Sequence, residues 1–241
     1  MKNRSTIRCR LRGLAALALL VLISSVVACR PGVRSNFEVD RWAGTPLEAA
    51  ATDAATASVR FAEIPNSAGL ILNVYSPTCG PCIDELPALK LLHARARELG
   101  VPMFLIATAF PADHGLELDP GASRAERVQA IADRLRVDVA RYGIDVPVVI
   151  MADDFRVSER DGLVTGTPET MFFRRSPLVL EYNFLGPISA GETPAEIESE
   201  TRYKFALRIL HRIRSAASSE NESGPYDATG YSDSDQSRPS L

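Results

Sequence analysis

The sequence predicts an α/β domain with a central mixed β-sheet and helices on both faces. Three features of the chain lead to this prediction. Apolar runs without alternation, which are typical of strands buried on both faces, recur through its middle. Between them lie segments with apolar residues every three or four positions, typical of amphipathic helices. A short proline-containing connection then joins two further apolar stretches, which indicates an antiparallel hairpin.

The first half of the predicted domain alternates strands and helices. Residues 59–64 alternate as a half-buried strand would, and the apolar residues 70–75 predict a central strand. A helix follows over residues 83–99, in which Pro87 removes a hydrogen bond and predicts a kink. The next buried strand is predicted over residues 101–107.

The second half of the predicted domain completes the sheet with a hairpin. Ser123 and Glu126 form a capping-box pattern at the start of a helix predicted over residues 123–136. The remaining predicted elements are a buried strand (146–151), two hairpin strands (169–173 and 178–184) and a final helix (194–213). The domain is therefore predicted to span residues 59–214.

Residues 1–28 have the pattern of a secretory signal peptide, with basic residues, an apolar run and then small residues. The run is short for a membrane-spanning helix, which needs about 20 residues. Residues 26–29, Val-Val-Ala-Cys, resemble the lipobox of bacterial lipoproteins. That resemblance implies that Cys29 becomes the acylated first residue and anchors the mature chain to a lipid bilayer. We expect an exported, lipid-anchored protein whose domain lies in the periplasm.

Two segments that flank the predicted domain lack its patterning. Residues 29–58 are rich in Ala, Thr and Pro and predict a tether, with a short helix over residues 46–57. Residues 215–241 are rich in Ser, Asp, Glu and Gly and predict a disordered acidic tail. The formal charge of the 241-residue chain is −3, and loss of the basic signal peptide would make it about −8. This charge argues against nucleic acid as a partner.

The cysteines narrow the chemistry that the chain can perform. Of the four cysteines, Cys9 leaves with the predicted signal peptide and Cys29 carries the lipid, so Cys79 and Cys82 remain. Two thiols three positions apart, between a strand and a helix, can close as a disulfide and reopen as a dithiol. A structural staple or half of a zinc site are the alternatives, although a structural zinc site needs four ligands. The three histidines are scattered and are interpreted as surface or satisfied residues, so no metal ligand is predicted.

Four features together resemble a known family. They are Cys79-Gly80-Pro81-Cys82 after a strand, Pro87 in the following helix, Thr167-Pro168 before a strand, and Gly186 after the hairpin. In this combination the chain resembles the TlpA/ResA-like thiol-disulfide oxidoreductases, membrane-tethered members of the thioredoxin-like superfamily. The resemblance covers roughly residues 59–214 and implies a thioredoxin-like fold.

The position of the motif assigns a role to each thiol. Cys79 falls at the predicted N-terminus of a helix, where unpaired backbone amides favour a thiolate, so it should attack the substrate. Cys82 lies one turn inside the helix and should resolve the mixed disulfide. The motif contains no basic residue, and the carboxylates of Asp84 and Glu85 oppose the thiolate. We therefore expect the pKa of Cys79 to lie nearer to thioredoxin's ~7 than to the ~3.5 of a strong oxidant, which favours a reductant.

The resemblance also implies roles outside the motif. TlpA/ResA-like proteins often carry a glutamate at the position of Glu85, where it is thought to assist proton transfer; the alternative is a solvated helix-cap acid. Asn73 stands where cytosolic thioredoxins have a buried aspartate, and its amide cannot carry the proton. Thr167 and Pro168 resemble the cis-proline segment that presents backbone groups to a bound peptide, so both are predicted to bind substrate. Thr78 replaces the tryptophan that usually precedes the first cysteine.

These expectations combine into one predicted function and several alternatives. The chain is predicted to be a membrane-tethered thiol-disulfide oxidoreductase that reduces disulfides of exported proteins through a Cys79/Cys82 dithiol-disulfide cycle. The resemblance implies apocytochrome c or a copper-site protein as substrate, a membrane-embedded electron donor, and no cofactor besides the redox-active disulfide. The alternatives are a thiol oxidase or isomerase, a copper-binding metallochaperone that uses both thiolates, and a lipoprotein in which the pair is only a staple.

Overall fold

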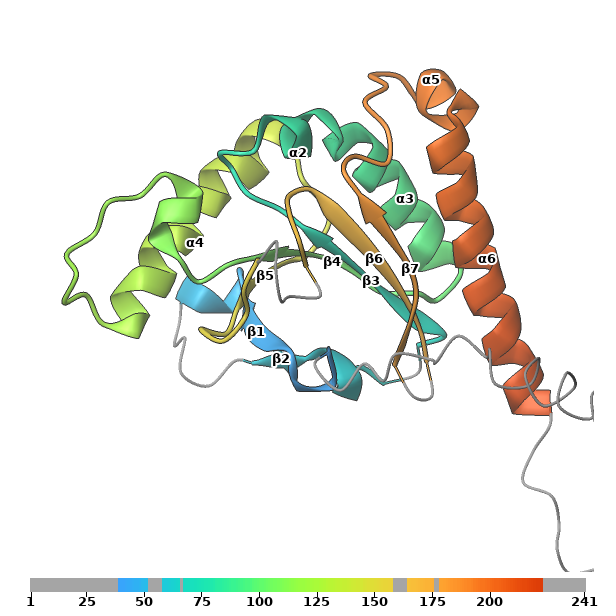
Figure 1. Cartoon of the computed structure of the whole chain (residues 1–241), viewed down its shortest axis with the longest axis horizontal. Coiled ribbons are helices and arrows are strands. Elements are labelled where there is room, and N and C mark those ends of the chain that lie inside the picture. Colours follow the sequence, from blue (N-terminus) through green and yellow to red (C-terminus); the bar gives the residue numbers. More distant parts are fainter. Residues whose placement is uncertain (1–38, 52–57, 66, 158–163, 176–177, 223–241) are drawn as a thin grey trace, which may run out of the picture. The chain divides into compact units, whose positions relative to one another are not determined.

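The computed structural model describes residues 39–51, 58–65, 67–157, 164–175 and 178–222 (Figure 1). The predicted signal peptide, Cys29 and residues 223–241 lie outside these ranges. Within them, every helix is too short or too polar to cross a bilayer.

A mixed sheet forms the centre of the domain. The strands are β1 (Ala43–Pro46), β2 (Val59–Arg60), β3 (Gly69–Val74), β4 (Met103–Ala107), β5 (Val148–Met151), β6 (Glu169–Arg174) and β7 (Val179–Leu185). The described residues pair them into one seven-stranded sheet with the order β2-β1-β5-β4-β3-β6-β7. Strands β3, β4 and β5 are parallel, and β6 and β7 form the predicted antiparallel hairpin. All six residues of β3 are buried, as expected of a central strand.

The helices cover one face of this sheet. They are α2 (Gly80–Asp84), α3 (Leu86–Glu98), α4 (Arg124–Tyr142), α5 (Pro194–Ser199) and α6 (Thr201–Glu222), with 3-10 turns η1 (Val39–Arg41), η2 (Ala49–Ala51), η3 (Phe61–Glu63) and η4 (Pro111–His114). Buried residues of all five α-helices belong to one core cluster, whereas η1, η3 and Phe155 pack in a second cluster against the opposite face.

The side on which the helices lie follows from the strand order. Strands β3, β4 and β5 are neighbours in the sheet, so α3 and α4 are successive right-handed crossovers in the same direction and fall on the same face. Helix α6 then packs beside α3 (Figure 1). The predicted mixed sheet with covering helices is confirmed, but the helices lie on one face instead of both.

The domain begins earlier than the sequence predicted. Strand β1 lies inside the sheet, between β2 and β5, although its residues belong to the predicted tether. Trp42 precedes it, is buried, and meets Phe155 edge to face with ring centroids 5.1 Å apart. The predicted strand over residues 59–64 is reduced to β2, because the buried Phe61 turns the chain into η3. Of the short helix predicted over residues 46–57, the described part contains only the single turn η2.

Two predicted helices are divided. The helix predicted over residues 83–99 breaks at Glu85, and Pro87 lies in the first turn of α3, so the predicted kink is confirmed. The final helix breaks at Glu200 between α5 and α6. The disorder predicted from residue 215 is wrong as far as Glu222, because Ala217 still packs against the core and α6 continues.

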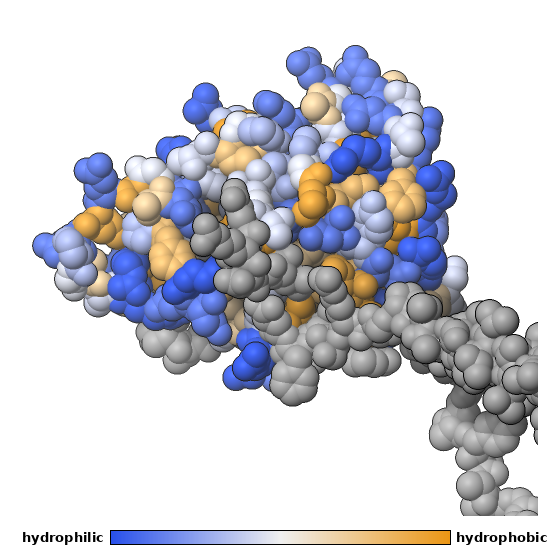
Figure 2. Space-filling model, viewed as in Figure 1, coloured by the Kyte–Doolittle hydropathy of each residue, from blue (hydrophilic) through white to orange (hydrophobic). Residues whose placement is uncertain are grey.

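The visible surface is mixed in polarity. Figure 2 shows hydrophobic and hydrophilic residues interspersed over the described part of this face. Within the described ranges, the exposed large hydrophobic residues are Leu118, Val137, Tyr182 and Leu185. Single exposed apolar side chains of this kind are ordinary in folded proteins.

Candidate active site

The two cysteines of the motif lie where β3 leads into α2. They are joined as a disulfide with an S–S distance of 2.03 Å. Cys79 is the N-cap of α2, and its Sγ accepts a hydrogen bond from the backbone N–H of Cys82 at 3.2 Å. Cys79 is partly exposed, whereas Cys82 is fully buried. An incoming sulfur atom can therefore reach Cys79 more readily than Cys82.

Glu85 lies buried one helical turn after Cys82, at the break between α2 and α3. Its Oε1 accepts a hydrogen bond from Nδ2 of Asn73 on β3 at 2.7 Å, and its Oε2 accepts one from the backbone N–H of Ile188 at 2.9 Å. Nδ2 of Asn73 also donates to Oγ1 of Thr170 on β6 at 2.9 Å. Asn73 and Ile188, from two distant parts of the chain, thus hold this carboxyl group directly, and Thr170 holds the amide of Asn73.

The surroundings of Glu85 favour its protonated form. Burial raises the pKa of this carboxyl from 4.5 to about 7. The hydrogen bonds from Ile188 and Asn73 and the charge of Arg202 oppose this rise in pKa without cancelling it. Glu85 is not the solvated helix-cap acid of the alternative interpretation, because its side chain is buried. A carboxyl with a pKa near ambient pH can both take up and release a proton.

The predicted proline segment lies beside the disulfide. The Thr167–Pro168 peptide bond is cis, as the family resemblance implies, and directly precedes β6. Pro168 is buried, and its C=O accepts a hydrogen bond from the N–H of Gly186 at 2.9 Å. Gly186 has a φ of 76°, a conformation that glycine adopts without a steric cost. Thr167 is exposed and lines the same cavity as Cys79.

A cavity of about 360 Å³ opens beside Cys79. Its described lining residues are Val74, Tyr75, Ser76, Thr78, Cys79, Thr108, Asp113, Val157 and Thr167. Oγ of Ser76 and Oγ1 of Thr78 both donate to the backbone C=O of Asp113 in η4, at 2.5 and 2.9 Å. The η4 segment therefore forms a polar wall next to Thr78.

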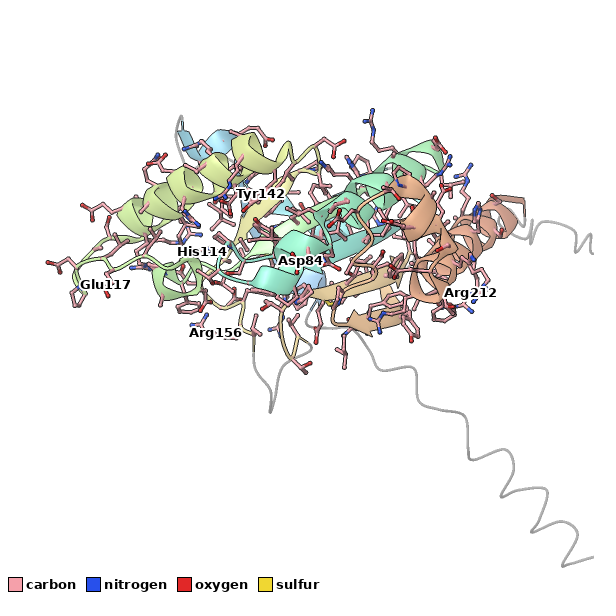
Figure 3. All side chains as sticks on the ribbon, turned by 90° about the horizontal axis from the view of Figure 1, so that it is seen from above. Asp84, His114, Glu117, Tyr142, Arg156 and Arg212 are labelled. Carbon is pink, nitrogen blue, oxygen red and sulfur yellow. A yellow bond between two sulfur atoms is a disulfide. The ribbon has the colours of Figure 1, made fainter. Side chains whose placement is uncertain are left out.

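Buried hydrogen bonds hold the residues around this wall in place. His114 of η4 is buried, with Nε2 at 2.9 Å from the backbone O of Thr108, and burial lowers its pKa. The hydroxyl of Tyr75 donates to Oδ2 of the buried Asp138 on α4 at 3.0 Å. Desolvation and the neighbouring Asp138 raise the pKa of Tyr75, so its hydroxyl remains a donor. The first contact ties η4 to the residue after β4, and the second ties the end of β3 to α4 (Figure 3, where His114 is labelled).

The fold brings together most of the residues that the sequence singled out. Cys79, Cys82 and Glu85 lie along one stretch of chain, and Thr167, just before β6, lines the same cavity as Cys79. Cys29, the predicted lipid attachment site, is outside the described residues. Sequence reasoning missed Thr108 and Asp113, although both follow a buried parallel strand, at the sheet edge where ligands usually bind.

The site has the parts needed for thiol–disulfide exchange: an accessible sulfur, a buried partner sulfur and a buried carboxyl with a pKa of about 7. Among the described residues, no group of three or more His, Cys, Asp or Glu side chains is arranged to hold a metal ion.

No protein-family model and no curated protein matches the chain. Among solved structures, it is similar to a secreted thiol-disulfide isomerase from Corynebacterium glutamicum, with 17% identity, a TM-score of 0.48 and coverage of 72% of this chain and 83% of that chain. A thioredoxin-family thiol:disulfide interchange protein from Chlorobium tepidum TLS has 16% identity, a TM-score of 0.45 and coverage of 71% and 92%.

A third similar structure is a secreted Mycobacterium tuberculosis disulfide oxidoreductase homologous to E. coli DsbE. It has 16% identity and a TM-score of 0.39, and the alignment covers 68% of this chain and 99% of that chain. At these identities and TM-scores, function has to follow from the chemistry of the site itself.

Proposed function

We propose that this protein is a thiol-disulfide oxidoreductase that reduces disulfides of exported proteins. The observation that carries the proposal is the asymmetry of the disulfide. Cys79 is reachable and lies at the N-terminus of a helix, whereas Cys82 is buried one turn before the carboxyl of Glu85. Attack and resolution need these two environments, because the first sulfur must meet a substrate and the second must remain protected.

The reaction starts from the reduced dithiol. The thiolate of Cys79 attacks one sulfur of the substrate disulfide, a new S–S bond forms, and the other substrate sulfur leaves as a thiolate that takes a proton from solvent. Glu85 accepts the proton of the Cys82 thiol, and the resulting thiolate attacks Sγ of Cys79. The Cys79–Cys82 disulfide forms as the bond between Cys79 and the substrate sulfur breaks, and that sulfur leaves as a thiolate that takes a proton from solvent. Glu85 then releases its proton to solvent, and the substrate departs with two thiols. Two electrons pass from the protein to the substrate.

The proposed direction rests on the charges near Cys79. The backbone N–H of Cys82 stabilises a thiolate at Cys79, as its hydrogen bond to Sγ indicates. Asp84 is exposed in α2 and adds negative charge close to that sulfur, so the thiolate is stabilised only moderately. A moderately stabilised thiolate makes a better reductant than the strongly stabilised thiolate of an oxidant.

We propose that the reaction occurs outside the cytoplasm, with the domain held at a bacterial membrane through Cys29. The support is the signal-like N-terminus and the lipobox-like residues before Cys29. A domain in an oxidising compartment needs a source of electrons, and a membrane-embedded donor would supply them. Proteins with cysteines that must be reduced before they receive haem or copper are the proposed substrates.

A trapping experiment tests the proposal. Cys82→Ala protein, incubated with a disulfide-bonded exported protein, should accumulate a mixed disulfide on Cys79 because the resolving thiol is missing. Cys79→Ala protein is the matched control and should trap nothing. Failure of the wild-type protein to reduce insulin would contradict the proposed activity, and a reduction potential near −120 mV would contradict the proposed direction.

A further inference from the structure

The cavity beside Cys79 combines apolar walls with one charged group. Val74, Tyr75 and Val157 provide the apolar surface. Among the described lining residues, Asp113 is the single one with a charged side chain. A volume of about 360 Å³ is at the lower end of the range for ligand sites, so it suits one or two side chains of a bound polypeptide.

The carboxylate of Asp113 is fixed at the cavity from two sides. Its backbone C=O accepts hydrogen bonds from Ser76 and Thr78, and its Oδ2 accepts one from Oγ1 of Thr108 at 2.6 Å. Its Oδ1 makes no hydrogen bond or ion pair within the part of the chain that the structure describes. The next residue, His114, is buried and secures η4. An incoming group would therefore meet a carboxylate that is already held in place.

Arg156, which precedes the cavity residue Val157 in the chain, has other partners. The guanidinium of Arg156 lies 4.0 Å from the centroid of the Phe110 ring and donates to the backbone O of Phe155 at 3.0 Å. It also donates to the backbone O of Asp153. Among the described residues, Asp113 forms no ion pair with a lysine or arginine.

We infer that this cavity selects substrates with a lysine or arginine one or two positions from the reacting cysteine. The inference rests on the proposed function, because it concerns the same site. An extended peptide advances about 3.3 Å per residue, so a residue at that distance reaches a cavity that borders Cys79. Lysine and arginine carry an apolar stem that fits against Tyr75 and Val157, and a charged end that pairs with Asp113.

The test measures attack on peptides that differ at one position. Three peptides with a single cysteine, joined to 2-thiopyridine as a disulfide, carry lysine, glutamine or glutamate next to the cysteine. Reduced Cys82→Ala protein attacks the peptide sulfur through Cys79, and the released thiopyridone gives the rate. Each rate is divided by that of the same peptide with free 2-mercaptoethanol, because the neighbouring charge alters the intrinsic reactivity of the peptide disulfide.

The lysine peptide should react about fivefold faster than the glutamine peptide, the most that an exposed ion pair commonly provides, and the glutamate peptide should be the slowest. The advantage should shrink as salt is raised from 0.01 to 1 M. Adding Asp113→Asn removes the carboxylate charge and should make the three normalised rates equal. The change preserves the backbone C=O that Ser76 and Thr78 hold, so η4 should stay in place.

Glu117→Gln is the matched control. Glu117 is an exposed acid of the same loop and lies farther from Asp84 than His114 does (Figure 3). It is absent from the cavity lining, so this variant should keep the ranking. Equal normalised rates for the three peptides in the Cys82→Ala protein would overturn the inference and leave the proposed activity intact. Release of no thiopyridone from any peptide would overturn both. A ranking that survives Asp113→Asn would overturn the role of Asp113.

Discussion

The two sulfurs of the disulfide face different surroundings. On the inner side, Cys82 lies one turn before Glu85, whose carboxyl is fully buried and receives hydrogen bonds from Asn73 and Ile188. On the outer side, Cys79 borders an open cavity lined by hydroxyl groups and the exposed Asp113. One side contains a buried acid that solvent does not screen, and the other contains a charge in contact with water.

Because of this difference, the two carboxyl groups can contribute very different amounts of free energy. A buried carboxyl interacts in a medium of low dielectric constant, so its protonation state can change stability and rate by several kcal/mol. An exposed carboxylate contributes about 1 kcal/mol or less. The inner side is suited to moving a proton, and the outer side to choosing among substrates. Substitutions on each side of the disulfide therefore test this division of tasks.

The largest expected effect is on the stability of the oxidised protein. Burial raises the pKa of Glu85 to about 7, so the unfolded carboxyl loses its proton near pH 4.5 and the folded one only near pH 7. The contribution of this carboxyl to the free energy of unfolding is therefore largest below pH 4.5 and falls by about 3 kcal/mol as the pH rises to 7. Glu85→Gln should remove this fall, as measured by urea unfolding at pH 4.5 and 7.5.

Asp84→Asn is the control for this measurement, since Asp84 neighbours Glu85 in the sequence but is exposed. It should leave the pH dependence of unfolding unchanged. Equal pH dependence in wild-type and Glu85→Gln protein would show that the buried carboxyl is not linked to folding.

The next effect concerns the attack of Cys82 on a mixed disulfide preformed on Cys79. If Glu85 accepts the proton of the Cys82 thiol, Glu85→Gln should slow this step roughly 10²-fold at pH 7.5. The wild-type rate should rise through an inflection near pH 7, which the variant should lack. Stopped-flow detection of the released thiol checks both points. An unaltered pH profile would leave Glu85 as a structural group only.

A smaller effect is expected on the outer side. Thr78→Val keeps the shape of the side chain but removes the hydrogen bond to the backbone C=O of Asp113. Ser76 still donates to that oxygen, so the loss should be about 0.5 to 1 kcal/mol. Amide exchange in residues 112–114 should become faster, while the inflection assigned to Glu85 stays in place. Movement of that inflection would show that the two sides are coupled.

The smallest effect tests the reach of a surface charge. Arg202 of α6 donates to the backbone O of Leu185 and of Gly186, at 2.9 and 3.2 Å, and its charge lowers the pKa of Glu85. Arg202→Gln should therefore raise the pKa of Glu85 further, by a fraction of a unit. NMR titration of the Glu85 carboxyl carbon measures this shift.

Arg208→Gln is the matched control for Arg202→Gln. Both guanidinium groups lie 5.4 Å from the centroid of an aromatic ring, Phe184 for Arg202 and Phe205 for Arg208. Arg208 is not among the groups that alter the pKa of Glu85, so its replacement should leave the titration unchanged. A shift of the same size in both variants would assign the effect to general surface charge.

Much of the site could be predicted because it is local in the sequence. The motif, Pro87 and Glu85 lie within one short stretch, and the strand before it is recognisable from its apolar residues alone. The wall formed by Asp113 could not be predicted in this way. Asp113 follows Thr78 by 35 residues, and only the pairing of β3 with β4 brings η4 to the motif.

Short-range spacing and hydrophobic pattern in the amino-acid sequence specify the reacting pair, its place at the start of a helix and the mixed sheet beneath it. The tertiary structure decided that the helices share one face, that β1 belongs to the sheet, and that Glu85 is buried while Asp113 is open to solvent. Burial is the sum of contacts from distant segments. For that reason the pKa of Glu85 and the chemistry of the cavity emerge only once β3, β4 and β6 have come together.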